Sequence, residues 1–340
     1  MRIGIDVGGS HIGLGLVNKD GKLVLKDEKD YDKRQEDMSN IVLETIIELI
    51  NKNIDNNNVK KEEIESIGIA FPGTVSETAV IKAENLGIDN FEVVEKIKKH
   101  FDVPIHLEND AKCAAIAEKE FGSLKEYEDA VFLIIGTGVG GAVYLNGKLL
   151  RPKRYSGFEV GHTVINKNGI KCNCGRNGCF EVYSSMRRLK EKINKEFNLN
   201  TTDGIKIREF MEENTNNKKL DKILDEYIQN LETGIANLIN IFEPQAISIG
   251  GSFGHYDILL KRLQDKINGK TELYNKEQIP KILIAELKND AGFFVVMEPN
   301  TGELLALVST PSYNSNDFVL GMTSEKWDEL NNDANKPLYN

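Results

Sequence analysis

The sequence is poor in positive charge, in cysteine and in long apolar runs, and each shortage excludes a class of protein. Its 43 lysine and arginine residues are outnumbered by 53 aspartate and glutamate residues, which gives a net charge of −10. Such a balance argues against a non-specific nucleic-acid surface, so we expect no nucleic-acid partner. Any phosphate site must then be built locally, from backbone N–H groups and a few cations.

Long apolar segments are also missing. The longest uncharged stretch, which includes residues 130–145, is rich in glycine and is shorter than the roughly 20 residues that a membrane helix needs. The opening residues MRIGIDVGGS lack the basic and apolar regions of a signal peptide. We therefore expect no membrane partner and a cytoplasmic location.

Only four cysteines occur, and three of them lie within eight residues. Cys172, Cys174 and Cys179 follow His162, whereas Cys113 stands apart. One imidazole and three thiolates complete a tetrahedral Zn²⁺ site, and a closed four-ligand site is structural rather than hydrolytic. The alternative is three free buried thiols and an unrelated histidine.

An internal repeat indicates the architecture. Residues 2–26 form a strand, a glycine-rich turn, a strand, an Asp-Gly turn and a strand, and residues 131–150 repeat that plan with an Asn-Gly turn. Two such copies predict two similar lobes with a cleft between them. Elsewhere helices and strands alternate, which predicts α/β layers. We expect helices at 38–53, 91–100, 110–121, 180–197, 205–213, 218–242 and 256–267, and further strands at 66–70, 105–107, 246–249 and 281–285.

The two glycine-rich turns are candidates for phosphate binding, because glycine lets backbone N–H groups approach a phosphate. Asp6 precedes the first turn and is suited to hold a hydrated Mg²⁺; a plain hairpin turn is the alternative. The second turn, Gly136-x-Gly138-x-x-Gly141, matches the letters of the dinucleotide fingerprint, but a strand follows it where that fingerprint requires a helix. We therefore reject a Rossmann site, and no Walker A sequence is present.

Glu108, Asn109 and Asp110 stand where a strand ends and a helix begins. We expect Asp110 to be the N-cap of that helix. A carboxylate at this edge can also accept the proton of a hydroxyl group that attacks a phosphoryl group. Capping alone is the competing interpretation.

Together these segments resemble the ROK family (repressor, open reading frame, kinase), and within it the glucokinase-like sugar kinases, over residues 1 to about 292. The resemblance implies an actin-like ATPase (ribonuclease H-like) fold, with an N-terminal lobe at 1–110 and a C-terminal lobe at 111–292 that carries the zinc loop. The segments that match are DVGGSHIG (6–13), GIAFPG (68–73), NLG (85–87), LEND (107–110), GTGVGGA (136–142), EVGH (159–162), CNCGRNGCFE (172–181), SIGGS (248–252) and KNDAG (288–292).

The resemblance also implies a reaction, which is ATP-dependent phosphorylation of a hexose at its 6-hydroxyl, with Asp110 as general base. Glucose is the first candidate, and fructose, N-acetylmannosamine and N-acetylglucosamine remain open. So does a sugar-binding module without catalysis. The family implies a homodimer or homotetramer. The implied sugar contacts are Gly73, Asn109, Glu159, His162 and Glu181. For Glu159 and Glu181, the alternative is a glutamate that is merely exposed to solvent. The implied ATP contacts are Asp6, Gly8, Gly9, Ser10, Gly136, Thr137, Gly138, Gly140, Gly250 and Gly251.

Some family members are repressors with a helix-turn-helix before the kinase-like body, and we expect none here because the chain opens on the first strand. Residues from about 293 to 340 instead resemble the start of a penicillin-binding protein transpeptidase domain. They predict two strands around a Pro-Asn-Thr-Gly turn and a short helix at 323–330. No Ser-x-x-Lys nucleophile occurs in them, so we expect no acyl transfer. We interpret the chain as a chimera that lacks the family's terminal helix, and we expect this loss to expose apolar surface on the lobe that the helix covers. A catalytically impaired sugar-binding chimera is the alternative to an active kinase.

Overall fold

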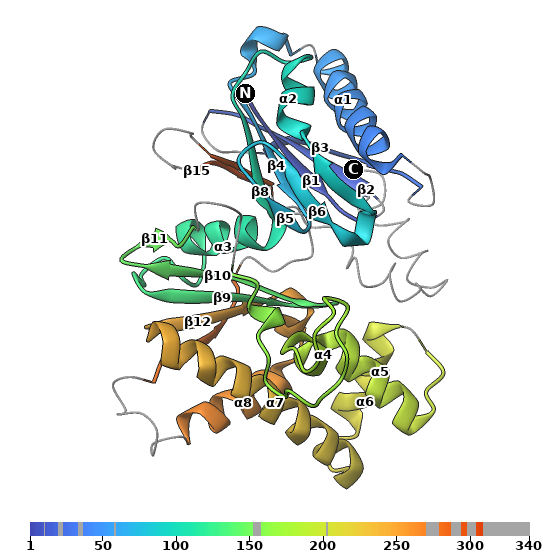
Figure 1. The fold of residues 1–340 in the computed structure, drawn as a ribbon, viewed down its shortest axis with the longest axis vertical. Coiled ribbons are helices and arrows are strands. Elements are labelled where there is room, and N and C mark those ends of the chain that lie inside the picture. The colour runs from blue at the N-terminus through green and yellow to red at the C-terminus, as the bar shows by residue number, and fades with distance from the viewer. Residues whose placement is uncertain are drawn as a thin grey trace.

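Two lobes, each built on a five-stranded sheet, stack one above the other (Figure 1). The structure is a computed structural model. It describes residues 1–9, 11–19, 23–32, 37–57, 59–151, 158–201, 203–269, 279–286, 294–297 and 304–308, the last two segments as backbone only.

The sheet of the first lobe has the strand order β3-β2-β1-β4-β8. Strand β2 pairs antiparallel with both β1 and β3, whereas β4 pairs parallel with both β1 and β8. Its strands are β1 (Arg2–Val7), β2 (His11–Val17), β3 (Leu23–Asp30), β4 (Ser66–Phe71) and β8 (Ile105–Asn109). Because β1, β4 and β8 run in one direction, their carboxyl ends meet at one edge of the sheet.

The sheet of the second lobe repeats that topology as β11-β10-β9-β12-β13, again with two antiparallel and two parallel pairings. Asn146 and Gly147, between β10 and β11, both have positive φ (53° and 71°), as a two-residue hairpin turn of this type requires. The strands are β9 (Ala130–Ile135), β10 (Val139–Leu145), β11 (Lys148–Leu149), β12 (Ala246–Gly250) and β13 (Lys281–Ile284). The predicted repeat is confirmed, and it extends from three strands to five.

Helix α1 (Met38–Asn56) covers one face of the first sheet with α2 (Val93–Lys98) beside it (Figure 1). Asp37 caps α1 by accepting a hydrogen bond from the Asn40 N–H, and the apolar residues at helical spacing, Val42, Ile46 and Leu49, are buried. The lobe also holds a three-stranded sheet that the sequence did not predict, together with two short 3-10 helices. These elements are β5 (Thr74–Val75), β6 (Val80–Ala83), β7 (Ile88–Phe91), Lys61–Glu63 and Glu84–Leu86.

The second lobe carries most of the helices on the face of its sheet that points away from the first lobe (Figure 1). The single helix expected over 180–197 is wrong. Helix α4 ends at Ser184, and the extended Ser185 (φ −71°, ψ 145°), whose N–H donates to the Glu181 carbonyl (3.0 Å), separates it from a second helix. In the described part of the chain, no helix is both long and apolar enough to cross a membrane. The helices are α4 (Glu181–Ser184), α5 (Met186–Phe197), α6 (Gly204–Glu213), α7 (Lys218–Phe242) and α8 (Asp257–Asn268).

Helix α3 (Asp110–Phe121) lies between the two sheets and contacts strands of both (Figure 1). Residues 111–118 are all buried, as a helix covered on every side must be. The buried Glu118 carboxylate accepts hydrogen bonds from the Ser123 N–H and hydroxyl (2.9 and 2.8 Å) and from the Glu286 N–H (3.1 Å). These bonds tie the end of α3 to the second lobe.

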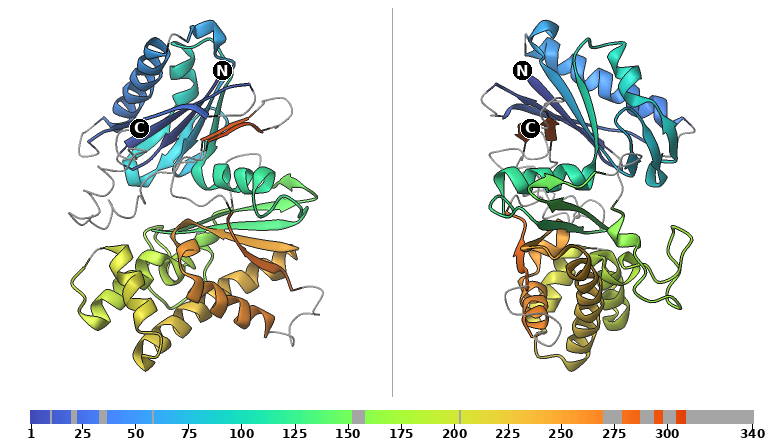
Figure 2. Two further views of the ribbon diagram at one scale, coloured as in Figure 1. Left: turned by 180° about the vertical axis from the view of Figure 1, so that it is seen from behind. Right: turned by 60° about the vertical axis from the view of Figure 1, so that its left-hand side comes forward.

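The two strands predicted for the C-terminal segment are confirmed as an antiparallel pair, β14 (Phe294–Met297) and β15 (Leu304–Val308). The pair lies against β1, β4 and α3, on the face of the first sheet opposite α1 (Figure 2). The helix predicted at 323–330 falls outside the described residues. The resemblance to a penicillin-binding protein stays a prediction.

Candidate functional site

Asp110 lies at the edge where the parallel strands of the first lobe end. The N-cap of α3 is Asn109, whose side-chain oxygen accepts a hydrogen bond from the Lys112 N–H (3.2 Å). The prediction that Asp110 caps the helix is therefore wrong, because β8 continues to Asn109. The Asp110 carboxylate instead accepts hydrogen bonds from the Ala111 N–H (2.8 Å) and from the Asn109 amide (2.9 Å).

Gly73 is brought against Asn109, as expected for two members of one site. The Asn109 side chain donates a hydrogen bond to the Gly73 carbonyl (2.9 Å). Gly73 has φ of +95°, and a Cβ there would lie 2.3 Å from the Lys82 carbonyl oxygen. Only glycine fits this position.

Three carboxylates interact electrostatically near the carboxyl ends of the parallel strands: Asp110 with both Asp6 and Glu159. Burial raises the pKa of Asp6 to about 7, and the charge of Asp110 adds to that shift. Asp110 borders solvent, yet desolvation by the surrounding protein is the main effect that raises its pKa to about 6; the hydrogen bond from Ala111 opposes this, and Glu159 adds to it. A carboxylate with this pKa can accept a proton near neutral pH.

The first glycine turn is held in place by Tyr31, a residue that no sequence motif indicated. The Gly8 N–H donates to the His11 carbonyl (2.9 Å), and the Tyr31 hydroxyl donates to the Gly8 carbonyl. Gly9 is exposed, and a Cβ built on it would have no neighbour within 4 Å. The turn therefore presents open backbone, although Ser10 lies outside the described residues.

The second glycine turn joins β9 to β10 and leaves Thr137 exposed. The Gly136 carbonyl accepts a hydrogen bond from the Arg187 N–H (3.2 Å), and Glu181 accepts one from the Val139 N–H (3.0 Å). A Cβ on Gly138 would lie 2.4 Å from the Glu181 carboxylate. Glu181, predicted to contact a sugar, thus also fixes this turn.

Gly140 packs closely against helix α3, and Gly251 packs closely against the backbone at the end of β9. A Cβ on Gly140 would lie 3.1 Å from the Ala111 side chain in α3, and Gly251 (φ +75°) would place one 2.8 Å from the Ile135 carbonyl. Gly250 and Gly251, with Gly254 and Ala285, line a small hollow between the end of β12 and the 3-10 helix Gly251–His255. Gly250 and Gly251, two of the predicted ATP contacts, therefore face a hollow beside the second turn.

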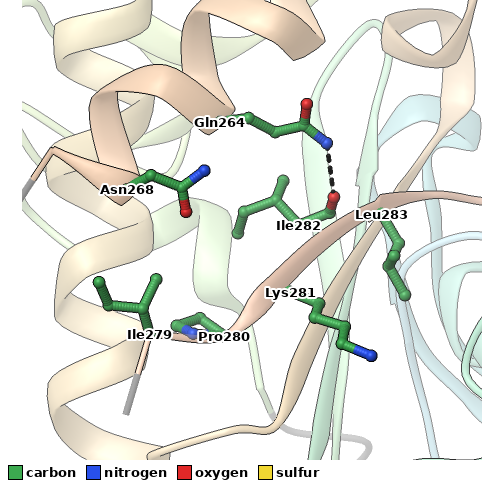
Figure 3. A pocket seen from close by; sticks show the side chains of 7 residues that line it. All are labelled: Gln264, Asn268, Ile279, Pro280, Lys281, Ile282 and Leu283. Carbon is green, nitrogen blue, oxygen red and sulfur yellow. Dashed lines mark hydrogen bonds between the residues drawn. The ribbon is translucent and has the colours of Figure 1, made fainter. Parts of the chain in front are cut away.

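A larger open hollow lies elsewhere, between α8 and β13 (Figure 3). Residues 279–283 line it together with Gln264 and Asn268, and the Gln264 amide donates to the Ile282 carbonyl (2.9 Å). None of the residues predicted for the site lies there.

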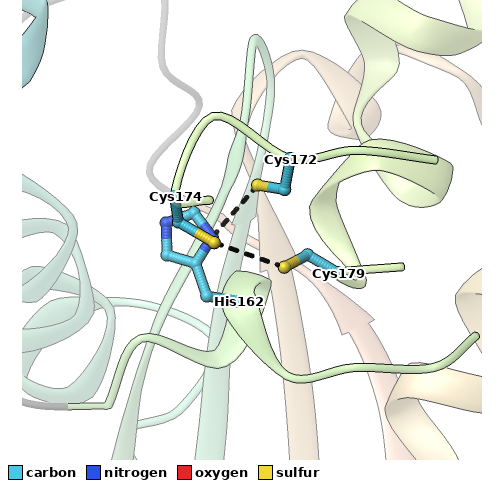
Figure 4. A group of neighbouring side chains, drawn as sticks. All are labelled: His162, Cys172, Cys174 and Cys179. Carbon is cyan, nitrogen blue, oxygen red and sulfur yellow. Dashed lines mark hydrogen bonds between the residues drawn. The ribbon is translucent and has the colours of Figure 1, made fainter. Parts of the chain in front are cut away.

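His162 and three cysteines form a compact cluster in the second lobe (Figure 4). The four ligand atoms lie within 4.8 Å of one another, with 3.6 Å between His162 Nδ1 and Cys172 Sγ and 3.5 Å between the sulfurs of Cys174 and Cys179. A tetrahedral Zn²⁺ with bonds of about 2.0–2.3 Å separates its ligands by roughly 3.5–3.8 Å. The donor set and its size fit zinc.

The loop that carries the cysteines turns at two glycines. Gly175 and Gly178 have φ of +90° and +76°, and a Cβ on Gly178 would lie 1.6 Å from the Asn166 carbonyl oxygen. The Cys172 N–H donates to the Arg176 carbonyl (2.8 Å), and a hydrogen bond from the Arg176 N–H lowers the pKa of Cys174 to about 6. Backbone geometry therefore brings the ligands together.

In addition to Tyr31, two residues near Asp110 were not indicated by any sequence motif. Arg151, which follows β11, forms an ion pair with the buried Glu108 at the end of β8. Lys112 is buried in the first turn of α3. A lysine inside an otherwise small and apolar run was the one available sign in the sequence.

Comparison with known proteins places these features in a family. The model of the ROK family matches residues 2–295. The chain is 29% identical over 305 residues to the xylose repressor of Caldicellulosiruptor bescii, covering 85% of this chain and 75% of the repressor. It is 29% identical over 282 residues to the glucokinase of Thermotoga maritima, covering 78% and 86% of the two chains.

Among solved structures, a ROK family glucokinase from Streptomyces griseus in complex with glucose and AMPPNP aligns with a TM-score of 0.67 at 23% identity. The alignment covers 86% of this chain and 96% of that one. This likeness confirms the predicted two-lobe actin-like ATPase fold. With the family model matching most of its length, the chain belongs to the ROK family.

Proposed function

We propose that the chain transfers the γ-phosphoryl group of ATP to the 6-hydroxyl of a hexose, with Asp110 as the general base. The position and basicity of Asp110 carry the proposal: it stands at the cleft edge of the sheet with a pKa raised to about 6. A base of this pKa is ionised at neutral pH and still accepts a hydroxyl proton as the phosphoryl group transfers.

The open backbone of the two glycine turns supports a nucleotide site. N–H groups in such turns bind phosphate oxygens, and Asp6 is placed to hold the hydrated Mg²⁺ that accompanies ATP. The small hollow at Gly250 and Gly251 lies beside the second turn, and we assign the adenosine end to this side of the turn. The Streptomyces griseus glucokinase was solved with AMPPNP, an ATP analogue.

We assign the sugar to the side of Asp110 that lies away from the proposed nucleotide site. Asn109 is fixed by the Gly73 carbonyl, and Glu159 interacts electrostatically with Asp110. Amide and carboxylate groups in this arrangement suit a ring with several hydroxyls. Glu181 and His162 complete the set, so the metal loop would form one wall of the sugar pocket.

The cluster of His162, Cys172, Cys174 and Cys179 is proposed to bind one structural Zn²⁺. All four positions of a tetrahedral ion are taken by protein ligands, so the metal would cross-link the loop and would not act on the substrate. The loop would then hold His162 and the nearby Glu159 in place.

A coupled assay of ADP release is the direct test of the proposed reaction. We expect turnover of glucose, and we expect fructose, N-acetylmannosamine and N-acetylglucosamine to react more slowly by about tenfold or more, since pocket contacts discriminate substrates by this much. Product analysis should locate the phosphate on O6. Absence of turnover with every one of these sugars would contradict the proposal.

The rate should depend on pH through Asp110. The base must be deprotonated to accept a proton, so kcat/KM should fall about tenfold per unit as pH drops below the raised pKa of about 6. Between pH 7 and 8 this group should leave the rate flat. A profile from pH 4.5 to 8 checks this, and an acid limb near pH 4 would mean that an unperturbed carboxylate controls the rate.

A second candidate function is sugar sensing without catalysis, which the match to a xylose repressor favours. It predicts binding of xylose or glucose in calorimetry without ADP release. Binding together with turnover would exclude it.

A further inference from the structure

Tyr31 reaches the first glycine turn from the end of a neighbouring strand. The pairing of β2 with β3 sets His11 opposite Asp30, so the next residue, Tyr31, lies level with the turn that precedes β2. Tyr31 belongs to the core of the first lobe, with only 9% of the residue exposed. Its hydroxyl donates a hydrogen bond to the Gly8 carbonyl. A side chain anchored in the core therefore fixes one atom of the turn.

The Gly8 carbonyl shares a peptide group with the Gly9 N–H. In a trans peptide these two groups point in opposite directions within one plane. The hydrogen bond that holds the Gly8 carbonyl toward Tyr31 therefore holds the Gly9 N–H toward the other side. Gly9 is exposed, and a Cβ built on it would have no neighbour within 4 Å, so a ligand can approach this N–H.

Glycine on both sides of this peptide group makes its orientation easy to lose. A peptide plane rotates through the ψ angle before it and the φ angle after it, and glycine permits most values of both. The Gly8 N–H donates to the His11 carbonyl (2.9 Å), which fixes the preceding peptide group and not the one between Gly8 and Gly9. If that group turned over, a carbonyl oxygen would replace the N–H and would repel a phosphate.

The Tyr31 hydroxyl is a protonated donor at neutral pH. Burial raises the pKa of Tyr31 to about 12, and the negative charge of Asp6 adds to the shift. A hydrogen bond to a carbonyl also polarises the peptide group and strengthens its N–H as a donor. Tyr31 thus both orients the Gly8–Gly9 peptide group and improves its N–H for binding an anion.

We propose that Tyr31 is a positioning residue for the nucleotide, whose hydroxyl fixes the Gly8–Gly9 peptide group so that the Gly9 N–H points toward a phosphate. The inference rests on the proposed function in one respect, that the first glycine turn binds phosphate. It deepens that proposal by naming the donor that the fold prepares and the side chain that prepares it. It assigns to Tyr31 an effect on nucleotide affinity and none on sugar affinity.

The test compares Tyr31→Phe, which removes the hydroxyl and keeps the ring, with the full-length wild type. We expect the Kd of AMPPNP with Mg²⁺ in calorimetry to rise about fivefold, which is about 1 kcal/mol and is typical of one hydrogen bond. The KM of ATP should rise in parallel. The Kd of glucose, and kcat at saturating ATP, should change less than about twofold, because distant sites behave independently.

Tyr227→Phe is the matched control. Tyr227 is buried in α7 of the second lobe, and its hydroxyl donates to the Ser184 carbonyl (2.8 Å). This variant also loses one hydrogen bond to a backbone carbonyl, but outside the first glycine turn, so it should bind AMPPNP as the wild type does. An equal loss of nucleotide affinity in both variants would overturn the proposal, because it would mean that any such hydroxyl acts through the fold in general.

Thermal melting decides whether each variant is folded, and Tyr31→Met, which also lacks the hydroxyl, replaces Tyr31→Phe if the latter does not fold. A folded variant that binds AMPPNP with wild-type affinity overturns the inference, as does one that loses glucose affinity to the same extent. Wild-type turnover is measured in the same series. If the wild type binds AMPPNP and phosphorylates no hexose, the proposed reaction fails and the affinity comparison still decides the role of Tyr31. If the wild type binds no nucleotide, both fail.

Discussion

Asp110→Asn is expected to lower kcat by about 10³-fold, within the range that general bases contribute, while glucose still binds. The amide keeps the shape of the side chain and can still accept a hydrogen bond from the Ala111 N–H, which the carboxylate now accepts at 2.8 Å. It cannot accept the proton of the sugar hydroxyl. The loss should therefore appear in turnover and not in affinity.

Two measurements distinguish this outcome from loss of structure. Calorimetry with glucose should give a Kd within about threefold of the wild type, because a neutral amide replaces the carboxylate in only one hydrogen-bonding contact. Asp102→Asn, an exposed position of the same lobe, should leave kcat unchanged. If Asp110→Asn retained more than about a tenth of the wild-type kcat, Asp110 would not be the base.

The variant should also lose the acid limb of the pH profile. In the wild type that limb reports the ionisation of Asp110, whose pKa is raised to about 6. Residual activity of the asparagine variant should not vary through this range. A limb that persisted near pH 6 would assign the titration to another group.

Cys172→Ala is expected to remove the bound metal and to destabilise the second lobe. Cys172 is buried, and its sulfur lies 3.6 Å from the imidazole of His162. Three remaining ligands leave an open position, which weakens a structural zinc site. Metal analysis should fall from about one Zn per chain to near zero.

The stability change should be large because the free energy of binding a structural metal contributes directly to the stability of the fold. Loss of a structural metal is among the mechanisms that exceed about 4 kcal/mol, which corresponds to about 10 °C in the melting midpoint of a lobe of this size. Sugar affinity should fall as well, since His162 and Glu159 lie in the same segment. A chelator added to the wild type should reproduce both effects.

Cys113→Ala is the matched control. Cys113 is also buried, but it lies in α3 and outside the cluster. Its replacement should cost about 1 kcal/mol from the small cavity and leave the zinc content unchanged. Equal metal contents in the two alanine variants would undo the zinc assignment.

Local patterns in the sequence predicted most of the elements that carry the site. Helix α7 runs over Lys218–Phe242 as expected, because its apolar spacing continues without a break. The sequence did not predict three features whose local conformation depends on tertiary contacts. These are the helix break at Ser185, the helix cap at Asn109, and the short strands β5, β6 and β7. A strand of two to four residues has too little periodicity to be distinguished from a loop.

The sequence by itself determined the cluster of His162 with three cysteines and the two glycine turns. Their residues are close along the chain, so spacing and glycine conformations suffice to bring the groups together. Gly175 and Gly178, both with positive φ between the ligands, show this directly.

Only the tertiary structure decided the electrostatics around Asp110. Asp6, Asp110 and Glu159 come from β1, from α3 and from the segment before a 3-10 helix of the other lobe, and only the stacking of the two sheets on α3 brings their charges within range. The same stacking buries Lys112. Because a pKa depends on burial and on charges that are distant in sequence, the basicity of Asp110 follows from the packing of the lobes and not from the LEND motif alone.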